Sequence, residues 1–178
     1  MSHKRMIFMK IAKITLSVST VLLSGGEILC VREGRGKKKG CWNIPTGQPH
    51  PGEPLLEAAM RELQEETGVK NCSLTGFLGL YSYWRKFHER KLRLVFLARV
   101  EDMPASLRLK VDGKEILEAR WITLSDWQEE LEENPDCWWK SGILQQIASN
   151  IQAGQCLPLD CIHEELSGIQ EGGIPSAF

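Results

Sequence analysis

The sequence predicts a single α/β domain, a sandwich with a central mixed β-sheet, and three observations lead to this fold class. The chain has 178 residues, which is the size of one ordinary domain with its own hydrophobic core. Several short segments have the apolar patterns of strands, and two longer ones have the apolar period of a helix. No internal repeat or linker divides the chain. Strands mixed with a few helices favour a layered α/β fold.

The first elements are expected to form a β-hairpin. Apolar and polar residues alternate from Ile14 to Ser19, which is the pattern of a half-buried strand. A Gly-Gly turn at residues 24–27 reverses the chain, and residues 28–32 form the returning strand. Residues 33–40 are rich in Gly and Lys and too polar to pack, so we expect a loop there.

A helix over residues 54–67 is the best-defined element. Pro54 suits the first helical position, strong helix formers follow, and Gly68 is placed to cap the end. Two strands are expected next, over residues 73–84 and 91–101, joined by a charged turn.

The last part of the chain adds one strand and two helices. The strand centres on residues 121–122, and residues 125–126 start a short helix over residues 127–132. Residues 141–151 have helical periodicity.

Charge and cysteine content exclude several classes of protein. With 22 basic and 23 acidic residues and a net charge of -1, no global field favours DNA, RNA or an anionic membrane. No apolar run is long enough to span a bilayer. The six cysteines include no C-x-x-C pair or zinc-like spacing, which indicates reduced, mostly buried thiols and a cytoplasmic location. We expect one domain over residues 1–160, a flexible tail over residues 161–178, and a monomer or a homodimer.

Three glutamates on one face of the predicted helix carry the chemistry. Their spacing of i, i+3 and i+4 makes the carboxylates converge, and like charges at this spacing repel each other. A divalent cation is the natural compensation, and hard oxygen ligands suit Mg²⁺ or Mn²⁺, which in turn suit phosphate chemistry. The residues are Glu62, Glu65 and Glu66.

A plainer interpretation is a solvated stripe of glutamates, but the surroundings argue against it. Arg61 lies four residues from both Glu57 and Glu65, so it can hold a neighbouring carboxylate. Gly47 and Gly52 bracket a proline-stiffened loop before the helix, where glycine permits a close approach.

This pattern resembles the Nudix box over residues 47–69. The residues that match its defined positions are Gly47, Glu53, Arg61, Glu62, Leu63, Glu65, Glu66, Gly68 and Val69. The resemblance implies the Nudix α/β/α sandwich and hydrolysis of a diphosphate linkage with Mg²⁺ or Mn²⁺.

The resemblance also implies roles for the box residues. Glu62, Glu65 and Glu66 would be metal ligands, and one of them would act as general base toward water. Arg61 would orient Glu62, and Glu53 would support the loop or bind a second metal through a water. Gly47 and Gly68 would be structural.

A further carboxylate from a later loop is expected to join the site. Glu115, in the turn before the strand at 121–122, is the first choice. Glu118 is the alternative, and Asp112 is weaker.

Substrate contacts are expected from residues around the box. Arg32 and the basic loop that follows it offer charge complementary to phosphates, and Gly47 lets the substrate approach the backbone. Trp42 and Tyr83 lie on flanking strands, where an aromatic ring can stack on a base.

The expected function is hydrolysis of a nucleoside di- or triphosphate or a related metabolite. The chain looks similar to two branches of the family, the NudJ-like phosphatases and the animal enzymes that clear oxidised guanine diphosphates. Three alternatives stay open: a phosphatase of thiamine-type diphosphates, an enzyme that removes diphosphate from RNA 5′ ends, and a Nudix-like domain that binds nucleotides without turnover.

Overall fold

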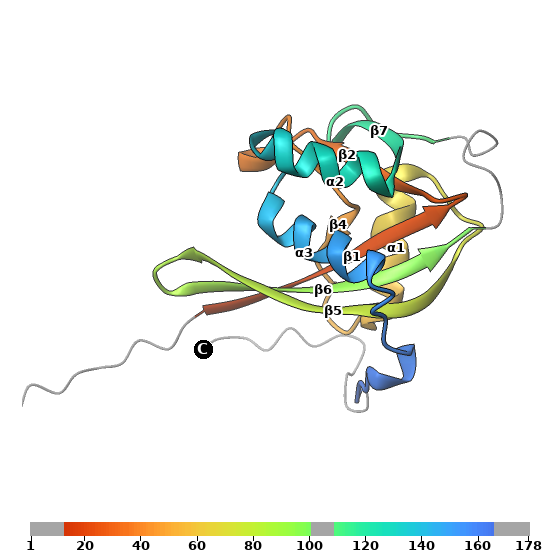
Figure 1. Cartoon of the computed structure of the whole chain (residues 1–178). Coiled ribbons are helices and arrows are strands. Elements are labelled where there is room, and N and C mark those ends of the chain that lie inside the picture. The colour runs from red at the N-terminus through yellow and green to blue at the C-terminus, as the bar shows by residue number, and fades with distance from the viewer. Residues whose placement is uncertain (1–12, 101–108, 166–178) are drawn as a thin grey trace, which may run out of the picture.

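The computed structural model describes residues 13–100 and 109–165, and it confirms an α/β fold with a central mixed sheet. In Figure 1 the sheet lies between helix α1 on one side and helices α2 and α3 on the other. The strands are β1 (Lys13–Ser24), β2 (Glu27–Glu33), β3 (Trp42–Asn43), β4 (Thr46–Gly47), β5 (Ser73–Lys86), β6 (Glu89–Arg99) and β7 (Ile116–Thr123), and the helices are α1 (Leu55–Thr67), α2 (Leu124–Glu133) and α3 (Ser141–Gln152).

Apolar side chains of the central strands point alternately to the two faces of the sheet, and each face has its own hydrophobic core. Val21 of β1 belongs to a buried cluster with Trp127 of α2 and Ile147 of α3. Its neighbour Leu22 belongs to a second cluster with Leu63 of α1. Successive side chains of a strand point to opposite faces, so one strand supports both helical layers.

Strand β1 organises the sheet, because it pairs with strands on both of its edges. It runs antiparallel to β2 and, in register from Lys13↔Glu89 to Leu23↔Arg99, parallel to β6. The short β4 also pairs with β1, through Val18↔Gly47. The β5–β6 hairpin therefore lies on one side of β1, and β4 lies on the other with the loop of residues 48–54 that follows it, here called the box loop. Strand β7 extends the sheet beyond β2.

Helix starts differ from the sequence prediction by one to three residues. Helix α1 begins at Leu55, and Pro54 is its N-cap rather than its first helical residue. Helix α2 begins at Leu124 instead of Trp127, because the Thr123 hydroxyl caps it by accepting a hydrogen bond from the backbone N–H of Asp126. The predicted cap at Gly68 is confirmed, with a φ of 76° and an N–H bonded to a carbonyl of the last turn.

The packed part of the chain extends past residue 160. Ile162 packs against the cluster under α1, and the Glu164 carboxylate accepts hydrogen bonds from the backbone N–H of Leu55 at 2.9 and 3.1 Å. The predicted tail at 161–178 therefore includes residues that contact the box helix, and residues 166–178 lie outside the described part.

The cysteines are all free thiols, as predicted, but only Cys30 is buried. Burial raises the pKa of this thiol far above its usual value. The expectation of mostly buried cysteines is wrong, because Cys137, Cys156 and Cys161 lie on exposed segments around α3. Within residues 13–100 and 109–165, no helix has the length and apolar content needed to cross a membrane.

Candidate active site

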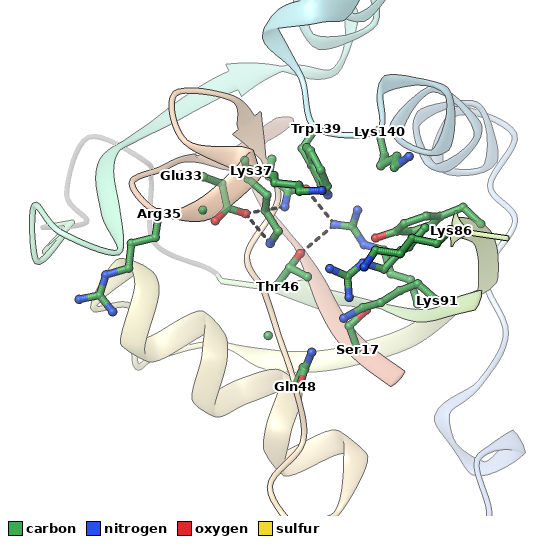
Figure 2. A pocket seen from close by; sticks show the side chains of 17 residues that line it. Ser17, Glu33, Arg35, Lys37, Thr46, Gln48, Lys86, Lys91, Trp139 and Lys140 are labelled. Carbon is green, nitrogen blue, oxygen red and sulfur yellow. Dashed lines mark hydrogen bonds and ion pairs between the residues drawn. The ribbon is translucent and has the colours of Figure 1, made fainter. Parts of the chain in front are cut away.

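A cavity of about 490 Å³ lies between the basic loop after β2, strand β4, the β5–β6 hairpin and the start of α3. Figure 2 shows Thr46 and Gln48 on the side of the box loop, and Lys86 and Lys91 on the side of the hairpin. The cavity is therefore bounded by segments that lie far apart in the sequence.

Two carboxylates of α1 are held against the strand that borders this cavity. Glu66 accepts a hydrogen bond from the backbone N–H of Thr46 at 3.0 Å, and Glu62 accepts one from the backbone N–H of Gln48 at 3.1 Å. Neither glutamate lines the cavity, but Thr46 and Gln48 both do. Residues four apart on a helix share one side, so α1 presents both carboxylates to β4 and the loop after it.

Gly47 lies between these two contacts and has no space for a side chain. A Cβ at this position would fall 1.7 Å from the carboxyl carbon of Glu62. The structural role expected for Gly47 thus has a specific cause, which is the position of the Glu62 carboxylate.

Arg61 connects the box loop to the helix. Its guanidinium donates to Glu53 at 2.6 and 3.0 Å, to Glu62 at 2.9 Å and to the backbone carbonyl of Gln48 at 3.0 Å. The hydrogen bond from Arg61 lowers the pKa of Glu53 to about 2. Glu53 also accepts a hydrogen bond from the backbone N–H of His50, so Arg61 and Glu53 together fix the loop in front of Glu62.

Glu65 is the most exposed of the three glutamates. Its side chain is 59% exposed and pairs with Arg61 at 3.1 Å, one helical turn back. The physical reason is that like charges at these spacings repel, while Arg61 offers the opposite charge. Within the described residues, 13–100 and 109–165, no three His, Cys, Asp or Glu side chains group closely enough to hold a metal ion. Nη1 of Arg61 donates to both Glu62 and Glu65, at 2.9 and 3.1 Å, so these two carboxylates lie close together, whereas Glu66 accepts from Thr46.

Glu66 lies in an environment that disfavours its charge. Burial, together with the nearby Glu33 carboxylate, raises its pKa to about 8. Glu33 lines the cavity and accepts hydrogen bonds from Asn43 at 2.8 Å and Lys38 at 2.9 Å. A divalent cation relieves this kind of repulsion, and carboxylate oxygens are the ligands that Mg²⁺ and Mn²⁺ prefer, so the donors fit such an ion.

Glu33 and Arg93 are two buried site residues that the sequence analysis did not identify. Arg93 is 2% exposed, lines the cavity, and donates to Ser19 at 2.7 Å, Asn43 at 3.0 Å and Thr46 at 2.8 Å. Burial lowers the pKa of this guanidinium to about 10. An arginine within the apolar run of a strand was a usable signal in the sequence, because charged residues are seldom buried without a partner.

The predicted substrate contacts divide into two groups. Gly47 and Tyr83 line the cavity, whereas Arg32 and Trp42 do not. Arg32 donates to the carbonyl of Gly40 and pairs with an exposed glutamate of β7. Trp42 packs on one side against Trp138, and the Arg120 guanidinium lies 4.2 Å from its ring centre, so its ring is already occupied.

The later carboxylates also lie away from the cavity. Glu115 pairs with Arg35, and its side chain is 63% exposed. Glu118 pairs with Arg32 at 3.7 Å. Asp112 accepts hydrogen bonds from three consecutive backbone N–H groups and holds the turn before β7. None of the three lines the cavity, because each is engaged at the surface.

Comparisons with known proteins found a matching family model and several similar sequences and structures. A family model described as NUDIX domain matches residues 13–141. The chain is 35% identical over 103 residues to Nudix hydrolase 6 of Arabidopsis thaliana, covering 57% of this chain and 35% of that protein. It is 32% identical over 95 residues to the human 8-oxo-dGDP phosphatase NUDT18, covering 53% of this chain and 28% of that protein.

Two further similar proteins are covered over a larger share of their own length. An isopentenyl-diphosphate Delta-isomerase of Cereibacter sphaeroides is 28% identical over 128 residues, covering 68% of this chain and 70% of that protein. Among solved structures, a NUDIX hydrolase from Nitrosomonas europaea superposes with a TM-score of 0.70 at 25% identity, covering 87% of this chain and 99% of that one. The chain spans only about a third of the length of Nudix hydrolase 6.

Proposed function

This chain belongs to the Nudix family, and on that premise we propose that it is a metal-dependent hydrolase that cleaves the diphosphate linkage of a nucleotide-like metabolite. The observation that carries the proposal is the pair Glu62 and Glu66, each held by a backbone N–H of a residue that lines a basic cavity. The complete set of box residues supports hydrolysis over a binding role without turnover.

Glu62 and Glu66 would hold a divalent cation, Mg²⁺ or Mn²⁺. Each is held in place through one oxygen. When bound, such an ion neutralises phosphate oxygens and lowers the pKa of a coordinated water. Glu65 would join them by turning from its exposed pair with Arg61, and it would accept the proton of the attacking water. Arg61 would keep Glu62 in position, and Glu53 would keep Arg61 in position.

The cavity supports a phosphorylated substrate with an aromatic part. Tyr83 and Trp139 line it together with several lysines and arginines. The similarity to an enzyme named for 8-oxo-dGDP favours nucleoside di- and triphosphates. Thiamine-type diphosphates and RNA 5′ ends remain weaker candidates, since each carries the same linkage.

A different reaction is favoured by one comparison. The similarity to isopentenyl-diphosphate Delta-isomerases extends over a larger share of both chains than the similarity to either hydrolase. Isomerisation of isopentenyl diphosphate moves a double bond and leaves the diphosphate intact, so product analysis separates it from hydrolysis.

The proposal is tested with the full chain and a panel of substrates in Mg²⁺ or Mn²⁺. The panel contains nucleoside di- and triphosphates, 8-oxo-dGDP, ADP-ribose, thiamine diphosphate, isopentenyl diphosphate and 5′-triphosphorylated RNA. We expect hydrolysis of at least one nucleotide, detected as phosphate, pyrophosphate or the two phosphate monoesters of a cleaved diphosphate bridge, and loss of that hydrolysis in EDTA and in the Glu62→Gln, Glu66→Gln double variant. Binding of a nucleotide without any turnover, or turnover of isopentenyl diphosphate alone, would reject the proposal.

A further inference from the structure

The cavity is lined by many more cationic side chains than acidic ones. Its lining includes eight cationic side chains and one carboxylate, Glu33. Three of the cations are matched by carboxylates, as Arg35, Lys38 and Arg85 each form an ion pair. The cations without a carboxylate ion pair among the described residues are Lys37, Lys86, Lys91, Arg93 and Lys140.

Arg93 is the strongest indication that an anion belongs in the cavity. Its guanidinium is almost fully buried and its three hydrogen-bond partners are neutral, two hydroxyls and an amide oxygen. The carboxylates of Glu33 and Glu66 act on Arg93 from a distance, but neither forms an ion pair with it. A buried charge without a directly paired counter-ion is costly, and a bound anion lowers that cost. Lys91 lies two residues away on β6 and therefore on the same face of the sheet.

Lys91, Lys86 and Lys140 gather around Tyr83 at the hairpin side of the cavity. Lys91 pairs with Tyr83 across β5 and β6, and Lys140 lies 4.9 Å from the centre of the Tyr83 ring. Figure 2 shows Lys86, Lys91 and Lys140 on this side and Arg35 pointing away from it. Lys140 also has a φ of 59°, which a lysine rarely adopts. The nearby carboxylate, Glu89, is ion-paired with Arg85, and none of these three lysines forms an ion pair with a carboxylate among the described residues.

This group of lysines lies well away from the box carboxylates. Gly47, which borders Glu62, pairs with Val18 of β1, and Lys91 pairs with Thr15 of the same strand. Three residues along a strand correspond to ~10 Å, and β4 and β6 lie on opposite edges of β1, ~10 Å apart. Adjacent phosphates of a diphosphate are much closer together than this.

We propose that Lys86, Lys91 and Lys140 form a second anion subsite that binds a terminal phosphate group remote from the hydrolysed diphosphate. This rests on the proposed function and names its substrate class: diphosphate-bridged nucleotides that carry an additional phosphate monoester. Tyr83 and Trp139 form the wall between the two phosphate positions, where the aromatic or sugar part of the substrate lies.

Two pairs of substrates that differ by one phosphate monoester test the subsite. They are ADP-ribose with ADP-ribose 2′-phosphate, and dephospho-coenzyme A with coenzyme A. We expect kcat/KM to favour the phosphorylated member of at least one pair by about tenfold, the usual size of a charge-assisted contact. Lys91→Gln, and independently the exposed Lys86→Gln, should bring this ratio close to one.

Arg90→Gln is the matched control, because Arg90 is the exposed neighbour of Lys91 on the opposite face of β6 and does not line the cavity. Its ratio should equal that of the wild type. A wild-type ratio of one or less in both pairs, or an unchanged ratio in both lysine variants, would overturn the subsite. Thermal unfolding of each variant identifies any that fails to fold, and Lys86→Gln then decides.

Failure of the proposed function is recognised separately by equilibrium binding without metal. If no compound is hydrolysed, dissociation constants for the same two pairs are measured by calorimetry. A preference for the phosphorylated member that Lys86→Gln removes would support the subsite and reject hydrolysis. Equal affinity for both members would reject the subsite as well.

Discussion

The carboxylate of Glu62 occupies the space that a side chain at Gly47 would need. The nearest atoms to a Cβ at position 47 are the carboxyl carbon of Glu62 at 1.7 Å and its two oxygens at 1.8 and 2.0 Å. Strand and helix are therefore matched at this point, since the strand has no side chain where the helix places a carboxylate.

Gly47→Ala should move Glu62 without unfolding the protein. The overlapping group is the end of a flexible side chain, so it can shift, but it then loses its bond to the N–H of Gln48. We expect turnover to fall by about a hundredfold, which is the usual effect of misplacing a catalytic group by about 1 Å. Affinity for Mn²⁺, measured by calorimetry, should fall in parallel.

The control for this substitution is Gly142→Ala in α3, where an added Cβ meets no atom within 4 Å. It should keep full activity and gain up to about 1 kcal/mol of stability, because alanine is the better helix former. Wild-type Mn²⁺ affinity in Gly47→Ala would show that the position of Glu62 is unimportant.

Glu65→Gln should remove turnover and leave the fold unchanged. The side chain is 59% exposed, so the free energy of unfolding should change by less than about 0.5 kcal/mol. Loss of the proton acceptor should lower kcat by about a hundredfold or more. Glu57→Gln, an exposed glutamate on the same helix, is the matched control and should retain its rate. Wild-type kcat in Glu65→Gln would refute the assigned role.

Contacts within one helix were predictable from spacing alone. Helical geometry places Glu62 and Glu66 on one side, and it brings Arg61 to Glu65, as the sequence analysis expected. The division of partners among the three carboxylates, Arg61 for Glu62 and Glu65 but Thr46 for Glu66, was not foreseen. The choice between a shared metal and an ion pair with Arg61 depends on the surroundings of each carboxylate, which helical spacing does not describe.

Contacts between distant strands were not predictable in the same way. Glu33 and Arg93 reach the site because β2, β1 and β6 are neighbours in the sheet, and this order is a property of the whole fold. Glu115 was chosen for its position along the chain, yet its side chain pairs with Arg35 at the surface. Loop residues take their positions from local contacts that a single sequence does not reveal.

Binding of a phosphate group at the second anion subsite, formed by Lys86, Lys91 and Lys140, should weaken as the pH rises through about 8. Burial, and after it the charges of Lys38 and Arg85, lower the pKa of Lys91 to about 8, while Glu89 acts in the opposite direction. A lysine with a lowered pKa is charged below that value and neutral above it, so the cation is lost between about pH 7 and about pH 9.

The measurement is the metal-free dissociation constant of ADP-ribose 2′-phosphate at these two pH values. We expect it to rise by about tenfold in the wild type and to stay constant in Lys91→Arg, because a guanidinium keeps its charge in this range. ADP-ribose, which lacks the remote phosphate, provides the comparison. An equal loss of affinity for both compounds would assign the pH effect to another group.

Glu164 provides the cap that helix α1 lacks at its own N-terminus. Pro54 has no side-chain oxygen to accept from the first turn, and the backbone N–H of Leu55 instead donates to the Glu164 carboxylate. A carboxylate at this end also interacts favourably with the helix dipole. Glu164→Ala should lower the free energy of unfolding by about 1 kcal/mol.

The expected shift in Tm is about 3 °C for a chain of this size, measured by circular dichroism. Asp160→Ala, an exposed acidic residue of the same segment, removes the same charge and should leave Tm nearly unchanged. Because α1 carries Glu62 and Glu66 near its other end, fraying of its first turn should reduce stability while KM stays the same. Equal Tm values for Glu164→Ala and the wild type would mean that residues 161–165 rest on the helix without stabilising it.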